Sequence, residues 1–140
     1  MYASSLSTYP RVGLSNVRQG DPICDQYRAE MFRNRCHFAL ADGCNWGARP
    51  LEAAVRAADS FMDHLRNSLY NMNSVTAIKK ETLHALSSAH LAIIEGKRDP
   101  TDAGQTTLVG GVMFELEPER YKCQNIEVLH SFINSYSKRG

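Results

Sequence analysis

Apolar and polar residues alternate in two short stretches early in the chain, as they do in half-buried β-strands. Residues 27–31 alternate apolar with charged side chains and predict one strand, and residues 36–41 end in the apolar run FALA and predict a second. Residues 33–35, Arg-Asn-Arg, have the composition of a turn, so we expect an antiparallel hairpin. Asp25 precedes the first strand and Asp42 follows the second. Because hairpin partners approach to about 5 Å across a sheet, the pattern brings these two carboxylates together.

Asp42 stands at a strand end, followed by Gly43 and a run of turn-prone residues. A carboxylate there is held by a rigid element and still reaches the surface, as a metal or catalytic site requires. The alternative is a surface turn in which Asp-Gly only reverses the chain. For Asp25 the alternative is a turn or capping residue after Pro22.

From Pro50 the apolar spacing changes to steps of three and four, which predicts an amphipathic helix that ends at residues 71–73. A second helix is expected from residue 74 or 75 to Glu95, with Gly96 as its stop signal. The short connection favours antiparallel packing of the two helices. Their apolar sides would then cover one face of the sheet.

The remaining segments give weaker patterns. Residues 11–17 could form an edge strand, residues 97–105 read as a loop, and residues 126–136 have the spacing of a short helix. Residues 106–116 form the clearest strand pattern, with Gly110 and Gly111 in the middle. Paired glycines there indicate a bulge, the close approach of another backbone, or simply a weak point in the strand.

Composition excludes several classes of function. The chain has 140 residues, of which 43% are hydrophobic, enough for one domain with its own core. A net charge of +1 with scattered basic residues gives no general attraction to nucleic acid, and no stretch approaches the ~20 apolar residues of a membrane span. The four cysteines form no CxxC pair, so we expect reduced thiols in an intracellular, cytoplasmic protein. The histidines lack the i, i+4 spacing of a helical zinc pair and are interpreted as packed or solvated.

Three pieces occur in order along the chain: RQGDPICDQY, then FALADGCNWG with an alanine-rich helix after it, then AGQTTLVGGVMFEL. Over residues 11–116 this order resembles the metal-dependent serine/threonine protein phosphatases of the PP2C (PPM) family. The resemblance implies an α+β fold, a partial PP2C-like α-β-β-α sandwich with antiparallel strands and two long packed helices. It divides the chain into an N-terminal extension (1–10), the N-terminal portion of a PP2C-like domain (11–116) and a divergent tail (117–140).

The resemblance also implies a metal site. Asp42 would bridge two divalent cations, Mg²⁺ or Mn²⁺, the Gly43 carbonyl would ligate one of them, and Asp25 would hold the cluster through water. Such a metal pair lowers the pKa of a shared water, so that hydroxide can attack phosphorus in line. Arg18 would contact the substrate phosphate, since a guanidinium presents a fork of donors.

The chain departs from the family in Cys24 and in Cys44-Asn45-Trp46, and the later aspartates that complete the family's metal site have no counterpart. We therefore expect a PP2C-like serine/threonine phosphatase portion that is incomplete or inactive in this chain. The alternative is a non-catalytic PP2C-like interaction module, a pseudophosphatase or truncated isoform. The partner would be a phosphoprotein substrate or another protein. An unpaired edge at residues 106–116 would also favour an oligomer.

Overall fold

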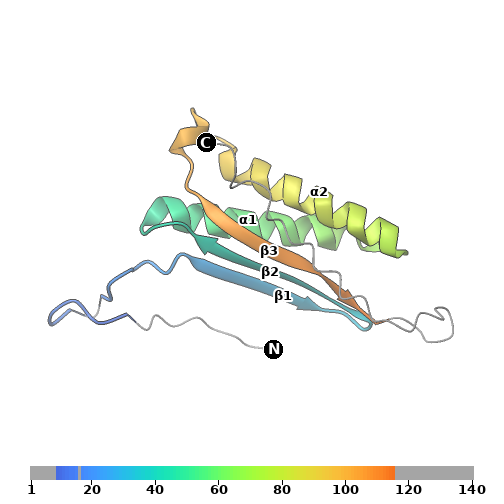
Figure 1. Cartoon of the computed structure of the whole chain (residues 1–140), viewed down its shortest axis with the longest axis horizontal. Coiled ribbons are helices and arrows are strands. Elements are labelled where there is room, and N and C mark those ends of the chain that lie inside the picture. Colours follow the sequence, from blue (N-terminus) through green and yellow to red (C-terminus); the bar gives the residue numbers. More distant parts are fainter. Residues whose placement is uncertain (1–8, 16, 116–140) are drawn as a thin grey trace.

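The computed structural model describes residues 9–15 and 17–115. These residues form one antiparallel sheet, two long helices and two short 3-10 helices: β1 (Asp25–Met31), β2 (Arg35–Gly43), α1 (Ala48–Asn67), η1 (Leu69–Asn71), α2 (Val75–Ile94), η2 (Pro100–Asp102) and β3 (Thr106–Phe114). The strand order is β1-β2-β3, and both helices lie on the same side of the sheet (Figure 1). The expected α+β class is confirmed, and the arrangement is compatible with a partial PP2C-like fold.

The helices begin and end close to the residues that the sequence predicted. α1 starts after Gly47, whose φ is 110°, and it ends at Asn67, earlier than predicted, because the chain tightens into η1. α2 starts after Ser74, whose side chain accepts a hydrogen bond from the Ala77 N–H (3.2 Å), and it stops before Gly96. α1 packs on all three strands, whereas α2 packs mainly along α1 and also contacts β3. None of the helices in the described part of the chain is both long and apolar enough to cross a membrane.

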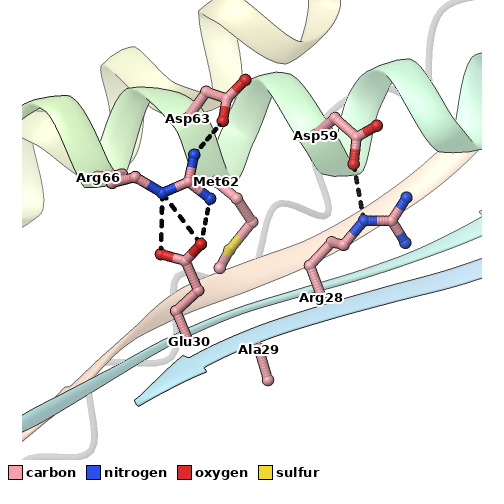
Figure 2. A pocket seen from close by; sticks show the side chains of 7 residues that line it. All are labelled: Arg28, Ala29, Glu30, Asp59, Met62, Asp63 and Arg66. Atoms are coloured by element: carbon pink, nitrogen blue, oxygen red, sulfur yellow. Dashed lines mark hydrogen bonds and ion pairs between the residues drawn. The ribbon is translucent and has the colours of Figure 1, made fainter. Parts of the chain in front are cut away.

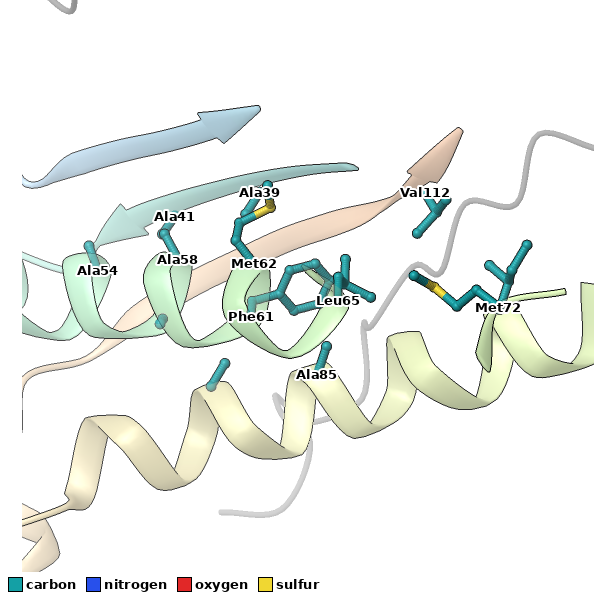
Figure 3. Close-up of a cluster of buried hydrophobic side chains, with 13 residues drawn as sticks. Ala39, Ala41, Ala54, Ala58, Phe61, Met62, Leu65, Met72, Ala85 and Val112 are labelled. Atoms are coloured by element: carbon teal, nitrogen blue, oxygen red, sulfur yellow. The ribbon is translucent and has the colours of Figure 1, made fainter. Parts of the chain in front are cut away.

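Alternation along β2 separates the two faces of the sheet. His37, Ala39 and Ala41 are buried and face the helices, whereas Leu40 and Asp42 are exposed on the opposite face. Alanine side chains on β2 and α1 allow this helix to lie close to the sheet, and larger side chains fill the rest of the space between them. The buried core shown in Figure 3 consists of Ala39, Ala41, Ala54, Ala57, Ala58, Phe61, Met62, Leu65, Met72, Ile78, Ala85, Ala89 and Val112.

Gly110 makes room for an aromatic ring of α1. A Cβ at this position would lie 2.5 Å from Cε1 and 2.7 Å from Cζ of Phe61. β3 pairs with β2 in unbroken register, with Gly110 opposite Ala39, so of the three alternatives for the glycine pair a bulge does not occur in this strand. The close approach that the sequence indicated does occur, but the main partner is a buried side chain rather than another backbone.

The expected strand over residues 11–17 is wrong. Gly13 adopts φ 56°, and the N–H of Val12 donates to the Val17 carbonyl (2.9 Å), so the chain reverses within a few residues. What remains is an isolated bridge between Arg11 and Arg18. The predicted helix over residues 126–136 and the tail over 117–140 lie outside the described residues.

Candidate functional site: a carboxylate pair on the open face of the sheet

Asp25 and Asp42 lie directly opposite each other on β1 and β2. Asp42 is in turn opposite Thr107 on β3, and partners in register share a face of the sheet. The three side chains therefore form a row on the open face, the side away from α1 and α2. The hairpin prediction that the two carboxylates lie together is confirmed. Their role as metal ligands stays a prediction.

The two carboxylates of the pair repel each other. The pKa of Asp25 is raised, first by desolvation and then by its hydrogen bond to Asp42 and by repulsion from the Asp42 charge. All three effects oppose full ionisation of the pair. A positive ion between the carboxylates would relieve both the repulsion and the desolvation cost.

Backbone contacts fix the end of β2 at Asp42. Its carbonyl accepts a hydrogen bond from the Thr106 hydroxyl (2.9 Å), and the N–H of Cys44 donates to the Gln105 carbonyl (2.8 Å). The segment that leads into β3 thus holds the Asp-Gly turn from the side opposite β1. The Asp42 side chain is consequently presented from a backbone bonded on both sides.

Gly43 occupies a position with no space for a side chain. A Cβ would lie 2.7 Å from both the Cβ of Cys24 and the carbonyl oxygen of Pro50. The Gly43 N–H donates to the Cys24 carbonyl (3.3 Å), which ties β2 to the residue before Asp25. This close packing explains the Asp-Gly pair on structural grounds. The role of the Gly43 carbonyl as a metal ligand stays a prediction.

Arg18 lies in the N-terminal loop. Its Nη1 donates to the Tyr9 carbonyl (2.7 Å), and its backbone N–H donates to Asp21 (2.6 Å). Within the described residues, Arg18 makes no hydrogen bond or ion pair with either carboxylate. The Tyr9 ring packs edge-on against Trp46 at 6.3 Å, so this loop lies beside the segment that follows β2. The phosphate contact of Arg18 stays a prediction.

The donor set of the pair suits a hard divalent cation in kind but is incomplete. Carboxylate oxygens are preferred ligands of Mg²⁺ and Mn²⁺. Over residues 9–15 and 17–115, however, Asp25 and Asp42 are joined by no third His, Cys, Asp or Glu within ligand distance. The other ligands of a metal there would have to be backbone, water or residues outside the described part.

A pocket of about 280 Å³ between β1 and α1 is lined by charged residues that already have partners. Arg28 pairs with Asp59 (Nε–Oδ1 2.7 Å), and Arg66 bonds both Glu30 and Asp63 (Figure 2). Because the guanidinium groups are engaged, the pocket is poorly suited to an added phosphate. Its ion pairs instead link β1 to α1.

A second cluster of titratable side chains escaped the sequence reasoning. His64 on α1 approaches Glu81 on α2 (Nε2–Oε2 3.0 Å), and His84 lies one turn further along α2. A hydrogen bond from His64, followed by one from Ser68, lowers the pKa of Glu81. The spacing of histidines within a single helix gives no sign of this cluster, because the cluster crosses between two helices. The i, i+3 spacing of Glu81 and His84 and the antiparallel pairing of the helices were the available signals.

Comparison with known proteins gives one distant relative, a protein of Drosophila melanogaster. The two sequences are 26% identical over an alignment of 146 residues, gaps included, which spans 99% of this chain and 20% of the relative. That relative is a PP2C-like domain-containing protein. The similarity supports a PP2C-like relationship, and this chain spans about a fifth of the relative's length. No family model matches the chain, and no solved structure matches it.

Proposed function

We propose that this chain contributes the first carboxylate pair of a PP2C-like, metal-dependent phosphatase that acts on phosphoserine and phosphothreonine in proteins. The observation that carries the proposal is the juxtaposition of Asp25 and Asp42 on the open face of the sheet. The distant PP2C-like relative supports it. Because no third His, Cys, Asp or Glu joins the pair among the described residues, the proposal requires further ligands from outside that part of the chain or from a partner.

In this proposal the Asp42 carboxylate and the Gly43 carbonyl would ligate Mg²⁺ or Mn²⁺, and Asp25 would hold the metal through water. When bound, a divalent pair supplies an activated water and stabilises charge on the phosphoryl oxygens. The contribution of this chain is to position the two carboxylates. The bonds from Thr106 and Gln105 hold the Asp-Gly turn, and β1 presents Asp25 beside it.

A second candidate is a non-catalytic PP2C-like module that binds another protein. Two observations favour it: the carboxylate pair lacks a third ligand in the described region, and Arg18 is bonded to the Tyr9 carbonyl. The open face also exposes Leu40, Val109 and Met113, each more than half accessible. In the described residues β3 pairs only with β2, so its free edge is where a partner or a second copy would add.

The test combines Mn²⁺ binding with hydrolysis of a phosphothreonine peptide, with and without Mn²⁺, for the chain and for its Asp42→Ala variant. We expect Mn²⁺ binding that is lost in Asp42→Ala, with no Mn²⁺-dependent turnover by the chain alone. Turnover that is lost in the variant would show that the site is complete, for example through self-association. If the folded chain binds no Mn²⁺, the non-catalytic module is the better description.

A further inference from the structure

We infer that His64, Glu81 and His84 form a binding site for a borderline transition-metal ion, Zn²⁺, in the groove between α1 and α2. The site is separate from the carboxylate pair, because that pair lies on the opposite side of the sheet from both helices. It also calls for different chemistry. Two imidazoles with one carboxylate are typical of Zn²⁺ and similar ions, whereas Mg²⁺ prefers oxygen ligands alone.

The distances are close to those of a metal-bound triad. The Oε2 of Glu81 lies 3.0 Å from Nε2 of His64 and 3.9 Å from Nδ1 of His84, and the three ligand atoms all lie within 4.8 Å of one another. In a tetrahedral zinc site with bonds of about 2.1 Å, ligand atoms stand about 3.4 Å apart. Closing the triad therefore requires only a small movement of His84, the most exposed of the three.

The two less exposed ligands are already oriented. His64 and Glu81 have side chains 24% and 14% accessible, and they hold each other across the helix interface. The second ring nitrogen of His64, Nδ1, lies 3.3 Å from the Ser88 hydroxyl. A second-sphere partner of this kind fixes ring orientation and leaves Nε2 available to the metal.

The orientation of His84 is not explained by the ion pair between His64 and Glu81. The His64–Glu81 contact already links the helices, and His84 is 52% accessible, yet its ring turns toward the same carboxylate and lies edge-on to His64 at 6.0 Å. Three protein ligands leave the fourth zinc position open to water or to a group from a partner.

The test is a Zn²⁺ titration of the whole chain, under reducing conditions, in competition with a chromophoric chelator. We expect one high-affinity Zn²⁺ per chain and a higher thermal midpoint with Zn²⁺ present. His84→Ala should weaken binding by about tenfold or more. His90→Ala is the matched control, since His90 is an exposed histidine of the same helix outside the cluster. Because His84 is exposed, its variant should retain the wild-type circular dichroism spectrum.

Cobalt substitution distinguishes this site from the cysteines. Co²⁺ bound by two imidazoles and a carboxylate gives d–d bands without sulfur-to-metal charge transfer, and Glu81→Gln should diminish those bands. The inference is overturned if Zn²⁺ affinity is equal in wild type and His84→Ala, if thiolate charge-transfer bands dominate, or if Asp42→Asn rather than His84→Ala removes binding. Equal Zn²⁺ affinity in wild type and His84→Ala, or dominant thiolate bands, would overturn this inference and leave the carboxylate proposal untouched, whereas loss of binding in Asp42→Asn would assign the metal to the carboxylate pair instead.

Discussion

Replacing Asp25 by Asn removes one of two negative charges that face each other across β1 and β2. Like charges directly opposite in a sheet destabilise it by about 0.2–1 kcal/mol, and Asp25 is solvent-exposed, so this surface range applies. The Asn amide can also donate a hydrogen bond to Asp42. We therefore expect Asp25→Asn to stabilise the metal-free chain at pH 7 by up to about 1 kcal/mol, or roughly 1–6 °C in thermal midpoint.

The pH dependence of this gain follows from the raised pKa of Asp25. The folded chain holds the Asp25 proton more tightly than the unfolded chain, so the stabilisation from this group is fully present below its ordinary pKa of 3.8. That stabilisation is lost as the pH rises through the raised folded value. The advantage of Asp25→Asn should accordingly be present at neutral pH and disappear below pH 3.8.

The assay is urea unfolding followed by circular dichroism, in EDTA, for wild type, Asp25→Asn and Asp102→Asn. Asp102 is an exposed acid on η2 and controls for the loss of one negative charge. High salt should shrink the gain, and in a separate series without EDTA millimolar Mn²⁺ should stabilise wild type but not Asp25→Asn. If Asp25→Asn lowers stability at pH 7, or matches Asp102→Asn, the two carboxylates do not repel as the structure implies.

Three further predictions concern the scaffold. Gly110→Ala should lower the free energy of unfolding in urea by about 1–3 kcal/mol, because its Cβ would overlap the Phe61 ring, and adding Phe61→Leu should recover part of that loss. If the losses of the two single variants simply add in the double variant, the predicted overlap is refuted. Burial, with a smaller effect from nearby arginines, lowers the pKa of His37 below 6.5, so the contribution of this group to stability should be full above pH 6.5 and fall on acidification. If the free energy of unfolding of His37→Leu depends on pH as steeply as that of wild type, this prediction is contradicted. Arg66→Ala should cost less than about 1 kcal/mol, since its ion pair with Glu30 is half exposed; a loss of several kcal/mol would show that the pocket has a larger structural role.

The carboxylate pair could be predicted from the sequence because its geometry depends on local information. The alternation in each strand sets which face a residue occupies, and the short turn sets the register. Asp25 and Asp42 are equally distant from the Met31–Cys36 pair that closes the hairpin, so this register places them opposite each other. The two helices could be predicted equally well, because the spacing of their apolar residues is regular over a long stretch.

The His64–Glu81–His84 cluster could not be found in the same way. It depends on how α1 and α2 rotate about their axes when they pack, which no single helix pattern contains. The space that Gly110 provides for Phe61 likewise depends on the depth at which α1 rests on the sheet. The N-terminal turn at Gly13 was missed because loose alternation over a few residues does not distinguish a strand from a reversal.

The most direct test of the account is paramagnetic mapping of Mn²⁺ on the ¹⁵N-labelled chain. The carboxylate proposal predicts selective broadening of amide signals around Asp25, Asp42 and Thr107, and Asp42→Asn should abolish it. Broadening confined to α1 and α2 near His64 and Glu81, or none at substoichiometric Mn²⁺ in a folded chain, would contradict the claim that this pair is a hard-metal site.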